Sequence, residues 1–141
     1  MTLISHLPSG RRQHVEARLR GNLMAWLTTV RPKGQPDSVP VWFLLQDDGT
    51  ILMYSEPDKL KLRNIEHNAQ VALGLDVTDL GRDIIRVTGT AECPPGYPSA
   101  VEVPAFVAKY TERIGAVFGT VADYSKAYSQ AIVITPTRLY A

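Results

Sequence analysis

Five short apolar segments follow one another between residues 23 and 92, and this run narrows the possible folds more than any other feature. Turn signals separate several of them. Arg31-Pro32-Lys33-Gly34 has proline second and glycine fourth, as in a type I turn, and Asp48-Gly49 is typical of a hairpin. Such connections are too short for parallel crossovers, which need about a dozen residues. We therefore expect antiparallel strands over residues 23–30, 38–45, 51–55, 71–76 and 84–92.

Helical patterns flank and interrupt these strands. Val15 and Leu19 lie four residues apart in a helix expected over residues 9–20, and Gly21 follows where a left-handed cap would fall. Asp58 is expected to cap a short helix that ends near residue 68. Two more helices and a last strand are expected over residues 104–114, 122–128 and 131–135. This order predicts an α+β protein, mainly antiparallel β, that forms a small barrel with short helices at its ends.

Length and charge limit the classes of function. A chain of 141 residues is expected to form one domain, residues 1–141. Its 15 Lys and Arg against 14 Asp and Glu give a net charge of +1, so we expect neither nucleic acid nor a membrane as partner. No apolar run approaches ~20 residues, and a cytoplasmic protein is the default expectation. The single cysteine, Cys93, excludes an internal disulfide and a multi-cysteine metal site.

Side-chain catalytic motifs are absent from the sequence. No HExxH, GxSxG or P-loop pattern occurs, and His6, His14 and His67 are expected to be surface histidines without a metal or catalytic role. The adjacent carboxylates Asp47 and Asp48 sit at an expected hairpin tip, where they favour the turn. We therefore name no catalytic side chain. If the protein is an enzyme, the reactive atom is expected to belong to a cofactor.

A cationic segment follows the third expected strand. The strand ends at Tyr54 and Ser55, a proline turn follows, and a helix then begins with Lys59, Lys61 and Arg63. Helix N-termini attract anions, so these residues could hold a monophosphate. The alternative is a solvated basic helix face with its leucines packed inward, and the residues alone leave both open.

The second expected strand contains an interruption. Pro40 lacks the N–H that a central strand needs, so it indicates an edge, a bulge or a place where a ligand replaces the neighbouring strand. Trp42 and Phe43 point to opposite faces of that strand. Core packing alone could also explain both rings.

Three segments together carry a resemblance: LMAWLTTVRPKGQPDSVPVWFLL, ILMYSEPDKLKLRNIEHNAQVALGL and IIRVTGTAEC. They resemble the pyridoxamine-phosphate-oxidase-like split β-barrel superfamily, and within it most closely the actinobacterial deazaflavin-dependent reductases that use coenzyme F(420). The resemblance is clear over residues 21–93 and loose over the helical last third.

The resemblance implies a split β-barrel, the FMN-binding split-barrel-like fold, that forms a homodimer with cofactor clefts at the subunit interface. The backbone beside the tricyclic ring would be that of Val39, Pro40, Val41, Trp42 and Phe43. The cofactor phosphate would be held by Tyr54, Ser55, Lys59 and Lys61, with Arg63 nearby. The implied activity is hydride transfer from reduced coenzyme F(420) to an unsaturated organic substrate, a small molecule.

Two alternatives remain open at this point. One is an FMN-binding oxidoreductase of the same fold, which would use the same anion site. The other is a non-catalytic flavin- or haem-binding protein. A true pyridoxamine-phosphate oxidase is not expected, because no histidine follows His67 to form its Arg-x-His substrate motif.

Overall fold

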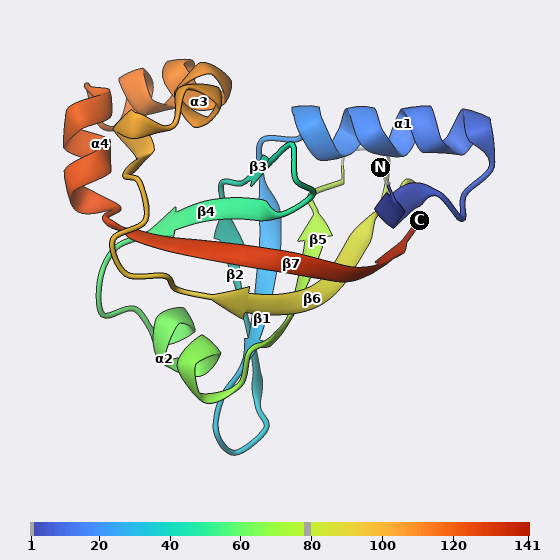
Figure 1. Ribbon diagram of the computed structural model, residues 1–141, viewed down its shortest axis with the longest axis horizontal. Coiled ribbons are helices and arrows are strands. Elements are labelled where there is room, and N and C mark those ends of the chain that lie inside the picture. The colour runs from blue at the N-terminus through green and yellow to red at the C-terminus, as the bar shows by residue number, and fades with distance from the viewer. Residues whose placement is uncertain (1, 78–79) are drawn as a thin grey trace.

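The computed structural model describes residues 2–77 and 80–141. Its strands form one curled sheet of seven strands within these ranges, in the order β2-β1-β5-β6-β7-β4-β3 (Figure 1). The strands are β1 (Ala25–Val30), β2 (Pro36–Val41), β3 (Leu44–Leu45), β4 (Ile51–Ser55), β5 (Gln70–Leu75), β6 (Arg86–Glu92) and β7 (Gln130–Tyr140). The helices are α1 (Ser9–Gly21), α2 (Leu60–His67), α3 (Pro104–Val117) and α4 (Val121–Ala127), with short 3₁₀ turns η1 (Thr2–Ile4) and η2 (Ala100–Glu102).

Every pairing between these strands is antiparallel, as the short connections predicted. The sheet curls into a half-barrel, and helices lie at its ends, with α1 apart from the α3–α4 pair (Figure 1). The predicted fold class, an α+β split barrel dominated by antiparallel strands, is therefore confirmed.

The core has two parts, and β4 separates them. Ile51 and Met53 pack inside the curl of the sheet, in a cluster that includes Leu19 of α1. The alternate residues, Leu52 and Tyr54, face the second cluster beneath α3 and α4. Both faces of β4 are thus buried, which is why the strand reads as a continuous apolar run rather than an alternation.

The single strand expected over residues 38–45 is wrong, because the chain forms two strands there. β2 pairs with β1 at one edge of the sheet, and β3 pairs with β4 at the other edge. Trp42 and Phe43 carry the chain between the two edges. Pro40 lies on the edge strand β2. A proline is tolerated there, because an edge strand has a neighbour on one side only and does not need every backbone N–H for pairing.

Other expected element ends are shifted for local reasons. α1 continues through Gly21, and Asn22 follows in an extended conformation, so Gly21 is not a left-handed cap. Asp58 does not cap α2: it adopts a left-handed φ of 62°, and Lys59 is the residue before the helix. β7 is longer than expected and continues past Pro136, where a shift in the register with β6 occurs beside Gly89. A Cβ at Gly89 would lie 2.4 Å from the Thr135 carbonyl oxygen, which explains a glycine at this point.

Apolar and charged contacts hold α1 in place. Val15 and Leu19 are fully buried on its inner face. Three basic side chains of α1, those of Arg11, His14 and Arg18, contact the carboxylate of Asp83, which precedes β6. Hydrogen bonds from His14 and Arg18 hold the pKa of Asp83 below its usual value. The ionised carboxylate of Asp83 therefore attaches α1 to the segment that leads into β6.

Candidate functional site

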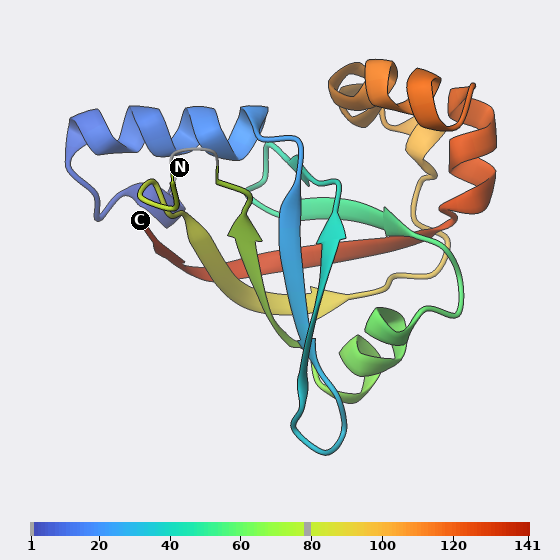
Figure 2. The ribbon, with the colours of Figure 1, turned by 180° about the vertical axis from the view of Figure 1, so that it is seen from behind.

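A pocket of about 510 Å³ lies where β2, the start of α2 and the α3–α4 pair meet. Figure 2 shows these three parts around one side of the sheet. The pocket brings together seven of the ten residues expected at a cofactor site: Val39, Pro40, Val41, Trp42, Tyr54, Lys59 and Lys61. Its other lining residues are Met24, Glu56, Val117, Phe118, Tyr124 and Tyr128.

The apolar wall of the pocket comes from β2 and the junction that follows it. Among the described strands β2 pairs only with β1, where Val39 lies opposite Leu27 and Pro40 opposite Trp26, so its outer edge is left without a strand. Trp42 follows directly and packs against the second core cluster, whereas Phe43 is fully buried in the first. The two rings therefore point to opposite sides, as expected. Only Trp42 lines the pocket.

A stack of four nearly parallel aromatic rings backs this wall. Tyr128 lies on Tyr124 with 4.8 Å between ring centroids, and Tyr124 lies 5.5 Å from Trp42. Tyr110 also stacks on Trp42, with 4.9 Å between ring centroids and 7° between the ring planes. Phe118 meets Trp42 edge-on at 6.0 Å. These ring contacts fix the position of Trp42, Tyr124 and Tyr128, which make this part of the pocket lining aromatic.

The cationic part of the pocket lies at the start of α2. The ammonium group of Lys59 forms an ion pair with Glu56 at 3.4 Å. Lys61, in the first turn of the helix, forms no ion pair with any residue that the structure describes. Burial lowers the pKa of Lys61, and the neighbouring charge of Lys59 adds to this effect, whereas the carboxylate of Glu56 opposes it. An anion in the pocket would offset both the burial of the Lys61 ammonium and its repulsion by Lys59, so the two lysines fit a phosphate group.

Three of the expected site residues lie outside the pocket lining. Phe43 belongs to the core. The hydroxyl of Ser55 is buried and donates to the Glu56 carbonyl at 2.7 Å. The guanidinium of Arg63 is exposed and donates to the Asp58 carbonyl at 2.8 Å, which stabilises the left-handed turn before α2. Tyr54 does line the pocket, but its hydroxyl donates to the Pro98 carbonyl.

The helical last third supplies pocket residues that the sequence did not indicate. Tyr124 lies on α4 and Tyr128 directly follows it, four residues along the chain, and both side chains line the pocket. This spacing was the only available signal, and it also fits a purely structural core. Burial raises the pKa of Tyr128, and the carboxylate of Glu56 raises it further. Tyr128 therefore remains a neutral hydrogen-bonding group beside a carboxylate.

The histidines lie away from this pocket. All three are exposed, as expected, and His14 contacts Asp83 with 2.6 Å between its Nε2 atom and the carboxylate. His6 lines a separate pocket of about 540 Å³ between η1 and the end of β7. No helix in the described ranges is long and apolar enough to span a membrane.

The curled antiparallel sheet, with an open pocket beside its edge strand, is that of a split β-barrel. The family model described as pyridoxamine 5'-phosphate oxidase matches residues 12–141, and the chain belongs to this family. The resemblance drawn from the three sequence segments is thereby confirmed.

Solved structures support the same fold. A protein named F(420) reductase is 26% identical, with a TM-score of 0.70 over 95% of this chain and 98% of that one. HupZ of Group A Streptococcus is 22% identical, with a TM-score of 0.64 over 91% and 90% of the two chains. Atu2129 of Agrobacterium tumefaciens, of unknown function, is 18% identical with a TM-score of 0.67; the match covers 94% of this chain and 56% of that one. No curated protein matches the chain.

Proposed function

We propose that this protein is an oxidoreductase that binds coenzyme F(420) in the pocket and transfers a hydride from the reduced coenzyme to an unsaturated organic substrate. The observation that carries the proposal is the composition of the pocket. It combines a lysine that forms no ion pair with any described residue, at a helix start, with an apolar wall on an edge strand. A phosphate-bearing tricyclic coenzyme needs both features in one cavity.

The similarity to a solved F(420) reductase favours the deazaflavin over other flavins. The match extends over nearly the whole of both chains at 26% identity. It therefore covers both parts of the pocket, β2 and the start of α2, as well as the helices α3 and α4. FMN is the alternative cofactor, because it carries a phosphate on a similar ring system.

Each part of the pocket has a separate role in the proposed reaction. Lys61 and Lys59 bind the phosphate, and the backbone from Val39 to Trp42 orients the ring. Trp42, Tyr124 and Phe118 exclude water from the ring, which favours hydride transfer over side reactions. The coenzyme, when bound, supplies the hydride. Binding, orientation and exclusion of water are thus the contributions of this chain.

The proposal includes a homodimer with the pocket at the subunit interface. Split barrels of this family are commonly dimeric with the ligand between subunits. In this chain the outer edge of β2 is not paired with any described strand, and Trp26 on the adjoining strand β1 is 43% exposed. A second copy that covers this surface would close the pocket from outside and remove apolar surface from water.

The test is a pair of titrations followed by ligand fluorescence. The protein is titrated with coenzyme F(420) and, separately, with FMN, and quenching gives each dissociation constant. Micromolar binding of F(420) with much weaker binding of FMN supports the proposal. The reverse order selects the FMN-dependent alternative. If neither ligand binds, the oxidoreductase proposal is wrong, and titration with haem then tests a non-catalytic binder.

A further inference from the structure

The junction between β2 and β3 depends on α3 for its hydrogen bonds. Phe43 lies between the two strands, so no strand satisfies its backbone N–H and carbonyl. The hydroxyl oxygen of Tyr110 accepts from the Phe43 N–H at 2.8 Å, and lies 2.9 Å from the Leu23 carbonyl oxygen. The ammonium of Lys109 donates to the Phe43 carbonyl at 2.7 Å. Two adjacent residues of α3 therefore hold both polar groups of Phe43.

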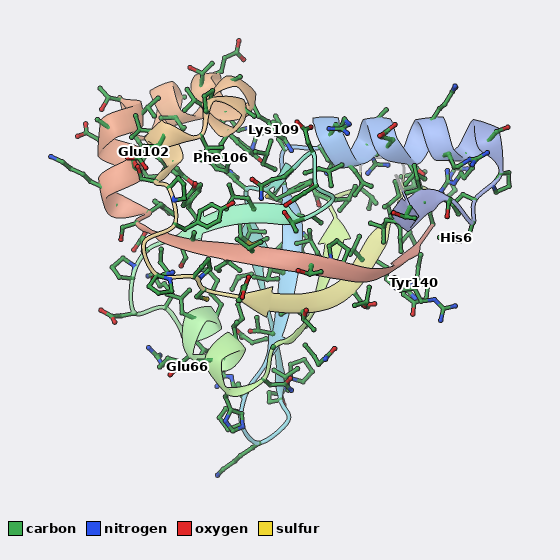
Figure 3. All side chains as sticks on the ribbon, in the orientation of Figure 1. His6, Glu66, Glu102, Phe106, Lys109 and Tyr140 are labelled. Carbon is green, nitrogen blue, oxygen red and sulfur yellow. The ribbon has the colours of Figure 1, made fainter. Side chains whose placement is uncertain are left out.

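Lys109 sits in an unusual environment for a lysine. Figure 3 shows it where α3 faces β3. Its ammonium lies 4.0 Å above the centre of the Phe43 ring, a cation–π arrangement. Burial lowers the pKa of Lys109 to about 8. The other titratable groups at the junction are Tyr110 and, one turn along α3, Arg113; no described carboxylate forms an ion pair with Lys109.

This junction is directly connected to the pocket. Tyr110 contacts Phe43 through its hydroxyl and Trp42 through its ring, and Trp42 lines the pocket. Trp42 also stacks on Tyr124, another pocket residue. A change in the position of Phe43 therefore shifts Trp42 within the wall against which a ligand would lie.

We propose that Lys109 and Tyr110 are positioning residues that clamp Phe43 and thereby hold Trp42 in the pocket wall, so that the wall loosens and ligand affinity falls when Lys109 loses its proton. The effect on affinity rests on the proposed function, because it requires a ligand in this pocket. The effect on Trp42 requires no ligand.

The chemistry of the clamp gives the direction of the effect. A protonated amine makes a hydrogen bond roughly twice as strong as a neutral one, and only the cation interacts with the Phe43 ring in this way. Loss of the proton therefore weakens both contacts to Phe43. We expect ligand affinity to fall roughly three- to tenfold between pH 7 and pH 9.5.

The first experiment follows Trp42 in a protein without ligand. The substitution Trp26→Phe leaves Trp42 as the only tryptophan. Its emission is expected to change with a midpoint near pH 8, and Lys109→Met in the same background is expected to remove that step. Burial raises the pKa of Tyr110 and Tyr124 above 10, so neither tyrosine titrates in this range. A step that persists in Lys109→Met, or no step in the parent, overturns the proposal.

The second experiment measures the dissociation constants of coenzyme F(420) and FMN between pH 7 and pH 9.5. The variants are compared in a Lys61→Ala background, because the lowered pKa of Lys61 would add a pH effect of its own. Lys109→Arg keeps the charge at every pH, so it is expected to retain the affinity of this background and lose the pH step. Lys109→Met is expected to bind weakly throughout. Lys126→Met, at the exposed end of α4, and Lys61→Ala are both expected to keep the step. If Lys109→Arg also keeps the pH step, the proposal that Lys109 holds Phe43 is overturned. If neither the parent nor any variant binds a cofactor, the proposed function is contradicted. The Trp42 emission experiment does not depend on that result.

Discussion

Lys61 is a half-buried cation that forms no ion pair among the residues that the structure describes. Burial costs free energy in the free protein, because the charged form loses water, and the carboxylate of Glu56 offsets this cost only in part. A side chain held at such a cost at the start of a helix is placed to meet an anion. The whole proposal for the phosphate end of the pocket depends on this residue.

Lys61→Ala is therefore expected to weaken binding of coenzyme F(420) about 10- to 150-fold, because a charge-assisted hydrogen bond to phosphate contributes roughly 1.5–3 kcal/mol. The free energy of unfolding without ligand is expected to change by less than ~0.5 kcal/mol. The measurements are the dissociation constant and the thermal midpoint. Lys33→Ala, in the exposed turn between β1 and β2, is the matched control and should change neither.

Lys59→Ala distinguishes the roles of the two lysines. Lys59 is exposed and already paired with Glu56, so its loss is expected to weaken binding less than the loss of Lys61. Equal losses would show that both ammonium groups reach the phosphate. Unaltered affinity in a well-folded Lys61→Ala variant would contradict the assignment of the phosphate site.

At the scale of elements, α1 is attached to the sheet through Asp83 as well as through its apolar face. Asp83→Asn is expected to lower the free energy of unfolding by about 1–3 kcal/mol, since hydrogen bonds between charged groups are lost. Urea unfolding at neutral pH measures this loss. Asp47→Asn, at the exposed β3–β4 turn, is the control and should have almost no effect.

The stabilisation that Asp83 provides through its contacts with α1 is expected to depend on pH. The pKa of Asp83 is lowered in the folded protein, so the unfolded chain takes up a proton first as the pH falls. The stabilisation is complete above the ordinary carboxyl pKa of about 4, and it is lost as the pH falls through the lowered value. The difference in stability between the parent and Asp83→Asn should therefore shrink below about pH 4. A constant difference down to pH 2 would contradict this account of the contact.

Elements could be predicted from the sequence where local pattern and tertiary structure agree. β4 and the turn at Asp48-Gly49 are examples, because an apolar run and a hairpin signal determine both. The break after Val41 could not be predicted. Trp42 and Phe43 continue the apolar run, and the groups that satisfy Phe43 come from α3, more than 60 residues later.

Some residues of the candidate site could be predicted from the sequence, and others could not. The cations near the start of α2 and the residues of β2 could be named from the sequence, because proline and charge interrupt patterns there. Tyr124 and Tyr128 could not, because two tyrosines four residues apart are as typical of a core as of a pocket. Arg63 was expected near the phosphate, beside the lysines, but its guanidinium donates to the Asp58 carbonyl in the left-handed turn before α2, which the sequence did not indicate.

For the whole molecule, we expect a dimer in solution. The exposed edge formed by β2 and Trp26 offers unpaired backbone and apolar surface, which proteins usually cover. The interface is expected to bury well over ~1,000 Å² in total. Light scattering over a range of concentrations should give about twice the monomer mass of 15.6 kDa. A constant mass equal to that of the monomer would exclude the dimer and the shared pocket.

The most direct test of the proposed cofactor site is a crystal structure of the protein with coenzyme F(420). The account predicts that the tricyclic ring lies in van der Waals contact with the backbone from Val39 to Phe43 and that the phosphate lies within hydrogen-bond distance of the Lys61 ammonium. A ring bound beyond contact distance of this segment, or a phosphate held elsewhere on the molecule, would contradict it.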